Sequence, residues 1–452
     1  MSEVPRTEPA ARPRAGDELD LSVERLAYGG AGVARVDGYV VFVRDGVPGD
    51  RVRARITRAK RSYAEADSLR LLEPSPERVE PVAPHPGAPW QVLPYERQLA
   101  EKEAQVRDAL RRLGGFDSPP VDPMVPAERT LRYRNKVEYS FGTVPDGDLV
   151  LGFHRPGRFD LIDAVTSDVL ASERVDALRE AVAEWCRAEG LTAWDRSDGS
   201  GFLRNLVVRE GRRTGELQAR LVTSEGSFRA DALSAALPGA SLLWTKTAGV
   251  AEKTHGGETD VVSGRGWIEE DLLGLRFRIS PDAFFQTNTE MAERLYGAAA
   301  ELALTGRERV LDLYCGIGTI ALALALDARE VLGVEIVEQA VADAIENARL
   351  NGVDNARFFS GDVRTAMRPL LERSGLPDVV VVDPPRAGLS QKVVRRVLEA
   401  SAERIVYVSC NPTTLAPNAR QIVDAGYRLE TVRPVDMFPQ TPHIESVALF
   451  RR

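Results

Sequence analysis

The sequence has few cysteines and no long apolar run, and each shortage excludes a class of protein. Only three cysteines occur among 452 residues, so a disulfide framework is excluded and we expect a reducing compartment. No apolar run approaches the roughly 20 residues that a membrane-spanning helix needs, and the first residues lack the pattern of a signal peptide. The sequence therefore predicts a cytoplasmic protein without a membrane partner.

Positive charge is also scarce, because 67 Asp and Glu outnumber 59 Lys and Arg and the formal net charge is -8. A nucleic-acid-binding protein often has a basic balance overall. Two local runs are nevertheless basic: Arg51, Arg53, Arg55, Arg58, Lys60 and Arg61, and further along Arg129, Arg132, Arg134 and Lys136. The first run begins with alternating basic and apolar residues, which places guanidinium groups on one face of a strand. Solvated faces explain either run about equally well, and a site for a nucleobase elsewhere in the chain would favour phosphate contacts.

The length predicts two to four domains, and the composition is that of an ordinary globular protein. We expect a disordered tail (1–15), a small β-barrel (16–73), a linker with a central α+β domain (74–270) and an α/β domain (271–452). The barrel is indicated by short alternating strands between the turns Gly29-Gly30, Asp37-Gly38 and Pro48-Gly49. A proline-rich stretch from residue 74 to 94 and a helix over 95–113 follow it.

In the C-terminal domain strands alternate with helices. The predicted strands are Val310–Tyr314, Val331–Val334, Arg357–Phe359, Asp378–Val382 and Arg404–Val408. Such alternation predicts an α/β fold with a doubly wound parallel sheet. Ligands of these sheets bind at the carboxyl ends of the strands.

The tips of these strands carry reactive residues: Asp312, Glu335, Asp362, Asp383 and Cys410. One acid at a tip often only caps the next helix, but caps alone do not explain all five. The turn 315–319 contains two glycines that let backbone amides approach a ligand, and an acid such as Glu335 binds ribose hydroxyls in nucleoside sites. A triphosphate cradle is missing, whereas NAD is not excluded by the glycines alone, and the acidic tips suit a nucleoside with a cationic centre.

Cys410 ends the last of these strands, because Pro412 prevents the strand from continuing. A thiol at this edge is well placed as a nucleophile, although a buried, inert cysteine is an equally common outcome. About one strand-turn-helix unit later comes Glu445, in the sequence His443-Ile444-Glu445.

Five motifs together resemble the RNA uracil-C5 methyltransferases, which make 5-methyluridine in ribosomal or transfer RNA. They are Phe284-Phe285-Gln286-Thr287-Asn288, Asp312-Leu313-Tyr314-Cys315-Gly316-Ile317-Gly318, Asp383-Pro384-Pro385-Arg386, Ser409-Cys410-Asn411-Pro412 and His443-Ile444-Glu445, in the family's order. The resemblance covers nearly the whole chain from about Asp17. It implies a class I methyltransferase that uses S-adenosylmethionine, with an RNA-binding TRAM barrel of OB-like type at the amino end.

The resemblance also implies roles for individual residues. Cys410 becomes the nucleophile and Glu445 the general base. Cofactor-site positions are Gln286, Tyr314, Glu335, Asp362 and Asp383. The family's segment matching Val82 to Tyr95 commonly carries cysteines that ligate an iron-sulfur cluster. Here it contains none, so we expect no cluster.

The resemblance further suggests that helix 95–113 packs on the catalytic domain. We expect Cys315, which lies in the cofactor turn beside Tyr314, to be structural, and His443 to shape a turn rather than catalyse. RNA is the expected partner of a monomeric enzyme. Large-subunit (23S) ribosomal RNA is favoured, since a TRAM barrel accompanies many ribosomal enzymes, and tRNA is the alternative. Amino-methylating enzymes favour an aromatic residue where Arg386 stands, and cytosine-C5 enzymes place a cysteine in the Asp-Pro-Pro motif, which has none here. A catalytically silent RNA-binding protein would not need Cys410 and Glu445.

Overall fold

The computed structural model describes residues 12–144, 146–155, 157–249 and 254–452. Most of the tail predicted over residues 1–15 therefore lies outside the described residues. The chain divides into two compact units. The first comprises Met1–Val82, Pro89–Gln105 and Gln440–Pro442, and the second comprises Ala83–Ala88, Val106–Pro439 and His443–Arg452.

The first unit is built on a six-stranded sheet with the order β1-β5-β6-β4-β3-β2. The strands are β1 (Glu18–Ser22), β2 (Arg25–Leu26), β3 (Gly32–Val36), β4 (Tyr39–Arg44), β5 (Arg51–Ala59) and β6 (Tyr63–Glu73). In β5 the apolar residues Val52, Ala54 and Ile56 are buried and the arginines between them are exposed. The alternation read from the sequence is thus confirmed.

The exposed arginine row of β5 is not a bare cationic surface. Arg53 pairs with Asp20 at 2.5 Å and Arg55 with Glu18 at 2.7 Å, both on β1. Arg51 pairs with Glu73 on β6 at 2.6 Å. The sequence could not show this pairing, because the acids come from neighbouring strands of the ladder.

Outside its sheet the first unit contains a 3-10 turn, η1 (Pro89–Val92), and the start of α1 (Tyr95–Arg112). Gln98 on α1 exchanges two hydrogen bonds with Gln440: its Nε2 donates to Gln440 Oε1 at 2.8 Å, and its Oε1 accepts from the Gln440 backbone N–H at 2.9 Å. The helix predicted over 95–113 is confirmed.

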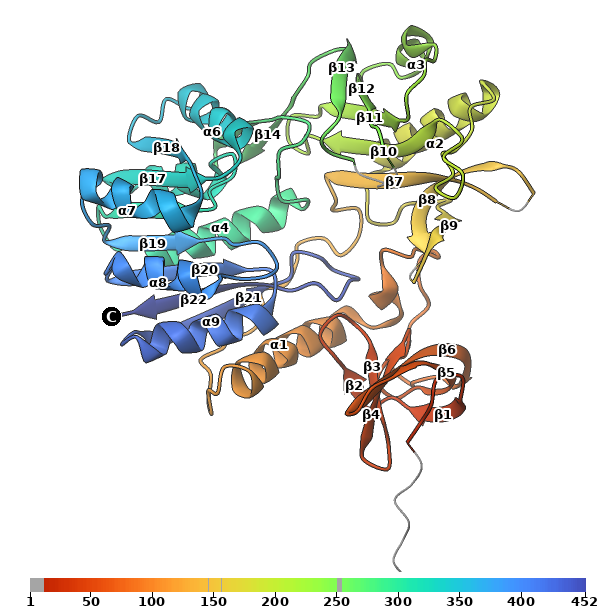
Figure 1. The fold of residues 1–452 in the computed structure, drawn as a ribbon, viewed down its shortest axis with the longest axis horizontal. Helices are drawn as coiled ribbons and strands as arrows, with labels where there is room; N and C mark the ends of the chain where they lie inside the picture. The colour runs from red at the N-terminus through yellow and green to blue at the C-terminus, as the bar shows by residue number, and fades with distance from the viewer. Residues whose placement is uncertain (1–11, 145, 156, 250–253) are drawn as a thin grey trace, which may run out of the picture. The chain divides into compact units, whose positions relative to one another are not determined.

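The second unit contains a seven-stranded sheet with the order β13-β12-β11-β10-β7-β8-β9, flanked by two helices (Figure 1). Its elements are β7 (Lys136–Thr143), β8 (Leu149–Arg155), β9 (Arg158–Ala164), α2 (Glu173–Ala188), β10 (Leu203–Glu210), β11 (Leu217–Thr223), α3 (Ala230–Ala236), β12 (Ser241–Lys246) and β13 (Glu258–Ser263). One face of this sheet packs on α2 and α3 around a single apolar core.

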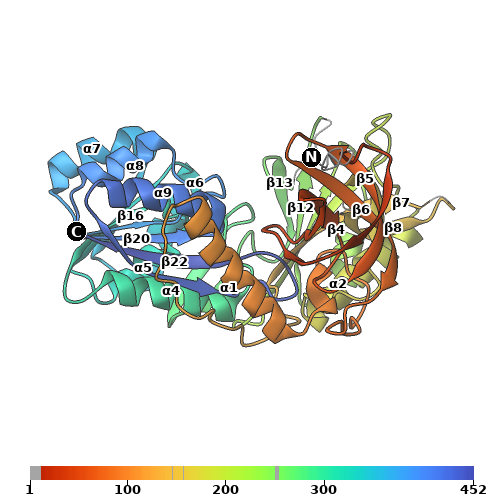
Figure 2. The same cartoon turned by 90° about the horizontal axis from the view of Figure 1, so that it is seen from below.

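The same unit contains a second seven-stranded sheet, with the order β18-β17-β16-β19-β20-β22-β21. Its elements are α4 (Thr289–Ala303), β16 (Arg309–Leu313), α5 (Thr319–Ala325), β17 (Glu330–Glu335), α6 (Glu338–Leu350), β18 (Ala356–Ser360), α7 (Val363–Ser374), β19 (Val379–Val382), α8 (Gln391–Glu399), β20 (Arg404–Ser409), α9 (Pro412–Asp424), β21 (Arg428–Val435) and β22 (Glu445–Arg451). The predicted parallel strands pair as expected, whereas β22 joins β20 and β21 antiparallel. Figure 2 shows α4 and α5 on one face and α7, α8 and α9 on the other.

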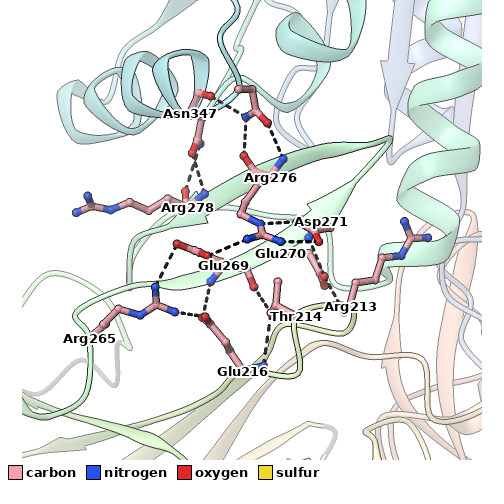
Figure 3. A network of polar contacts seen from close by, with 11 residues as sticks. Arg213, Thr214, Glu216, Arg265, Glu269, Glu270, Asp271, Arg276, Arg278 and Asn347 are labelled. Carbon is pink, nitrogen blue, oxygen red and sulfur yellow. Dashed lines mark hydrogen bonds and ion pairs between the residues drawn. The ribbon is translucent and has the colours of Figure 1, made fainter.

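A hairpin of β14 (Ile268–Leu272) and β15 (Leu275–Ile279) is tied to both sheets (Figure 3). The Glu270 carboxylate accepts from the backbone N–H groups of Arg212 and Arg213 at 2.9 and 3.0 Å. On the other side Asn347 of α6 bonds the Arg278 backbone and donates to the Ile317 carbonyl at 3.1 Å. Ile317 lies in the glycine-containing turn 315–319. The hairpin therefore connects that turn to the sheet of β7 to β13, which we call the central sheet.

The segment Ala83–Ala88 lies within the stretch from Val82 to Tyr95, where the resemblance would place cluster ligands, and it is held by a buried polar network. His85 Nε2 donates to Asp168 Oδ1 at 3.0 Å, since His85 Nδ1 accepts from the Gly87 N–H at 3.1 Å. Tyr139 donates its hydroxyl hydrogen to Asp168 Oδ2 at 2.7 Å. Within the described ranges no group of three or more His, Cys, Asp or Glu side chains could hold a metal ion. Nor is any described helix both long and apolar enough to cross a membrane.

Candidate active site

The carboxyl end of β16 leads into a strained, glycine-containing turn. Tyr314 has a φ of 65°, and Gly316 and Gly318 have φ values of 54° and 85°. A tyrosine in the left-handed region costs free energy, which is tolerated chiefly at functional sites. A Cβ on Gly318 would also lie 3.0 Å from Phe358. The turn thus needs glycine, and it directs the amino end of α5 to the edge of the sheet.

Glu335, at the tip of β17, braces this turn. Its Oε2 accepts from the Gly316 N–H at 3.2 Å, and its Oε1 accepts from the Val337 N–H at 2.9 Å. Each carboxylate oxygen has a second lone pair. Glu335 can therefore accept hydrogen bonds from a pair of hydroxyl groups without releasing the turn.

A pocket of about 240 Å³ opens beside this turn. Its lining residues are Tyr314, Val334, Ile336, Gly361, Asp362, Val363, Arg364, Gly388, Ser390 and Val393. Asp362 caps α7 by accepting from the Arg364 N–H at 2.8 Å, and a hydrogen bond with the Arg364 guanidinium lowers the pKa of Asp362 to about 2. The pocket therefore combines apolar walls with the ion pair of Asp362 and Arg364, and apolar walls with a few polar groups suit a nucleoside.

Three carboxyl groups at the same edge of the sheet have raised pKa values. Asp312 is fully buried, and neither of its oxygens has a well-formed hydrogen bond among the described residues. Burial and then the charge of Asp383 raise the pKa of Asp312 well above its usual value, and a weak contact with the Ala321 N–H does not offset them. Burial raises the pKa of Asp383, which is partly exposed, to about 7. Burial and then Asp383 raise the pKa of Glu445 well above its usual range.

Cys410 follows β20 and is the most exposed of the three cysteines. Burial, followed by the charges of Glu445 and Asp383, raises the pKa of Cys410 to about 11, while Arg386 opposes the shift. Asn411 caps α9 and donates to the Arg386 carbonyl at 3.0 Å. Asn411, the residue after Cys410, thus holds the thiol next to the turn Asp383-Pro384-Pro385-Arg386.

Glu445 begins β22, opposite Val435 of β21. Two side chains hold the chain before it: Asn288, a motif residue, donates to the Met437 carbonyl at 2.9 Å, and Tyr133 donates to the Pro439 carbonyl at 3.0 Å. His443 packs its ring edge-on against Phe438, with the centroids 5.8 Å apart. Because β20 and β22 are paired strands, Cys410 and Glu445 meet at one edge of the sheet.

One residue of this region, Tyr296, was missed from the sequence. Tyr296 on α4 is buried, accepts from Thr319 Oγ1 at 3.5 Å and bonds the Gln286 side chain. Burial and then Asp383 raise its pKa well above the usual value, so it stays a neutral hydroxyl. It had only the pattern of a core residue on a helix. Asp312 was noticed at its strand tip, but its lack of partners is visible only in three dimensions.

These residues fit S-adenosylmethionine. Burial of a charged carboxylate such as that of Asp312 is unfavourable, and a cationic ligand would stabilise the charge. The glycine turn, Glu335 and the adjoining pocket match a nucleoside. Cys315 does not belong to the reactive group: it is buried, and its Sγ lies 2.9 Å from where a Cβ on Gly333 would be.

Comparisons with known proteins agree with this geometry. The family described as tRNA (uracil-5-)-methyltransferase matches residues 258–452, and the TRAM domain matches residues 13–69. Proteins described as uncharacterized RNA methyltransferases are similar along nearly their whole length. One from Chlorobaculum tepidum is 38% identical over 99% of both chains, and one from Gloeobacter violaceus is 40% identical over 97% of both. The crystal structure of Pyrococcus abyssi tRNA (uracil-54, C5)-methyltransferase with S-adenosyl-L-homocysteine covers 96% of this chain and 100% of its own, with a TM-score of 0.78 and 29% identity.

Proposed function

Because this chain belongs to the RNA uracil-C5 methyltransferase family, we propose that Cys410 and Glu445 carry out the covalent steps of uridine methylation. The protein is an RNA methyltransferase that uses S-adenosylmethionine. The observation that carries the proposal is the meeting of one thiol with the carboxyl groups of Asp383 and Glu445 at the tips of neighbouring strands.

Carbon 5 of uracil is a poor nucleophile, and Cys410 is positioned to change this. Its thiolate adds to carbon 6, and the displaced electron pair becomes an enolate across carbon 5 and the carbonyl oxygen. When bound, S-adenosylmethionine supplies the electrophilic methyl group that carbon 5 takes. Glu445 then removes the proton from carbon 5, the double bond between carbons 5 and 6 re-forms, and the thiolate leaves.

Ionisation of Cys410 is the difficult step in the ligand-free protein, since burial raises the pKa of its thiol to about 11. Thiolate, not thiol, is the nucleophile. Arg386 is the cation that opposes this shift, so we assign it the role of stabilising the thiolate. Asn411 keeps the Arg386 backbone in place.

We assign the cofactor to Gln286, Tyr314, Glu335, Asp362 and Asp383. Glu335 would accept from ribose hydroxyls, as its spare lone pairs allow. Tyr314 and Asp362 line the adjoining pocket. Asp383 and Gln286 lie on the side of Tyr296 and Cys410, where a positive charge on the ligand would be favoured.

For the RNA substrate we propose a uridine of large-subunit ribosomal RNA, supported by the TRAM domain over residues 13–69. A tRNA uridine is the second candidate, favoured by the Pyrococcus abyssi tRNA enzyme that resembles this chain over 96% of its length. Nucleoside mass spectrometry of ribosomal and transfer RNA, purified separately from a deletion strain, decides between them. Loss of 5-methyluridine from the tRNA fraction alone would reject the ribosomal substrate.

The covalent mechanism is tested with RNA that contains 5-fluorouridine and a labelled cofactor. Fluorine leaves no proton for Glu445 to remove, so the wild-type protein should remain bonded to the RNA on a denaturing gel. Cys410→Ala should give neither adduct nor turnover. Cys315→Ala is the matched control, because its thiol is buried in the same sheet edge and should not be needed for the adduct. A labelled band that persists in Cys410→Ala would identify a different nucleophile.

A further inference from the structure

The central sheet carries three cations on the face that turns away from α2 and α3. They are Lys136 on β7, Arg209 on β10 and Arg220 on β11. The alternate residues of these strands, such as Val137, Val208 and Ala219, pack in the core with α2, so the cations point to the opposite side. Lys136 and Arg209 are directly opposite each other in the ladder.

This cationic cluster is only partly neutralised. Lys136 pairs with Glu138 at 2.5 Å, and Arg220 pairs with Asp282 at 2.5 Å. Arg209 donates to the Ala283 carbonyl at 3.0 Å but has no carboxylate at ion-pair distance anywhere in the described part of the chain. Three cations thus face two carboxylates. Burial and then Arg220 lower the pKa of Arg209 to about 10, and the more distant carboxylates of Glu138 and Asp282 offset this only in part.

Asp282 holds the position that an external anion would occupy. Arg220 is only 3% exposed, but the Asp282 side chain that covers it is 48% exposed. The other oxygen of Asp282 accepts from the Gly256 backbone N–H at 3.4 Å. A half-exposed carboxylate therefore bridges a buried guanidinium and a backbone amide, which are the donors that bind phosphate in other proteins.

This cluster contacts the segment that leads to the proposed cofactor-site residue Gln286. Ala283, whose carbonyl Arg209 holds, is followed by Phe284, which is 69% exposed, and two residues later by Gln286. An anion bound at Arg220 would therefore lie beside the segment that carries the motif residues. Methylation of a flipped uridine requires that the flanking backbone be held.

We propose that Lys136, Arg209 and Arg220 form a binding site for a backbone phosphate of the RNA, which replaces Asp282 on Arg220. The inference rests on the proposed function, because it takes RNA to be the substrate. A phosphodiester accepts two hydrogen bonds from one guanidinium and brings the negative charge that Arg209 lacks. Asp282 neutralises Arg220 until RNA arrives.

The test measures RNA affinity against salt concentration, with an oligouridylate of about ten nucleotides as the probe. All variants are made in a Cys410→Ala background so that no covalent adduct forms. Arg209→Met should weaken binding and reduce the slope of log affinity against log salt by about 0.7, the contribution of one phosphate on a single strand. Asp282→Asn should have the opposite sign, binding about fivefold more tightly because a competing carboxylate is removed.

A double variant protects the test against misfolding. Arg220→Gln with Asp282→Asn removes both members of the ion pair, so no buried charge is left alone, and it should still reduce the slope. Arg229→Gln is the matched control, since this exposed arginine at the start of α3 pairs with Glu189 at the end of α2, and the slope of the variant should equal the wild-type value. An unchanged slope in the double variant, or weaker binding by Asp282→Asn, would reject the site. Methyl transfer by the wild-type protein to RNA from a deletion strain tests the proposed function separately.

Discussion

Two fully buried aspartates in the same unit differ in their hydrogen-bond partners and in the direction of their pKa shifts. Asp168 accepts hydrogen bonds from His85, Tyr139 and the backbone N–H groups of Leu170 and Ala171. Burial alone would raise its pKa, but these bonds outweigh burial and lower the pKa to about 2. Asp312 is equally buried, lacks comparable partners, and has a raised pKa. The fold can satisfy a buried carboxylate, so its failure to do so at the sheet edge indicates a place for a ligand.

The two aspartates also affect stability in opposite directions with pH. The folded pKa of Asp168 is below its unfolded value of 3.8, so its contribution, about 2 kcal/mol, is present above pH 4 and is lost as the pH falls through about 2. Asp312 has a folded pKa above 3.8. It binds its proton more tightly when folded, so stability declines as the pH rises from 3.8 through the folded pKa.

The largest effect expected from this comparison concerns Glu445, another buried acid with a raised pKa. Glu445→Gln should reduce turnover about a thousandfold, since a positioned general base contributes 10²- to 10⁴-fold, while the melting temperature stays the same or rises. On ordinary RNA a slowly resolving covalent adduct should accumulate. Turnover assays, denaturing gels and thermal melts measure the three quantities. A variant that loses stability together with activity would place Glu445 with Asp168, among the structural acids.

The second prediction concerns Asp168 itself. Asp168→Asn places an amide hydrogen against a donor of the His85–Tyr139 network and should lower the free energy of unfolding by about 3 kcal/mol. Urea unfolding measures the loss. Asp160→Asn is the matched control: a hydrogen bond with Arg158 lowers the pKa of Asp160 to about 2 as well, but the pair is exposed. If both variants are equally stable, burial does not decide the effect of a satisfied carboxylate.

The third prediction is that a substitution increases stability. Asp312→Asn removes a charge that the fold does not compensate, so the variant should be more stable than wild type at pH 8, by about 1 kcal/mol. At pH 4 the two proteins should melt alike, because the wild-type carboxyl is then protonated. Affinity for S-adenosylmethionine should fall. Thermal melts at both pH values and calorimetric titration with the cofactor provide the readouts, and a variant that is less stable at pH 8 would show that Asp312 has a structural role.

The sequence predicted the elements of the α/β domain because its strands and helices have strong periodic patterns. The strand expected over 378–382 is β19 (Val379–Val382), and the strand expected over 404–408 is β20 (Arg404–Ser409). Contacts between distant residues were not predictable. His85 and Asp168 are separated by 83 positions, and no local pattern marks either as the other's partner.

The smallest expected effect belongs to the exposed ion pairs of the first unit, where a charge is neither buried nor unpaired. The sequence favoured phosphate contacts for Arg53, yet Asp20 already neutralises it at 2.5 Å. Arg53→Gln should therefore leave the melting temperature unchanged, because exposed pairs contribute little, and should alter the salt dependence of RNA binding by less than about 0.7. Asp20→Asn frees the guanidinium and should make that dependence steeper. If Arg53→Gln instead reduces the slope by a full phosphate contact, RNA displaces Asp20 from Arg53. The exposed pair would then resemble the pair of Asp282 and Arg220, in which we propose that RNA displaces the carboxylate.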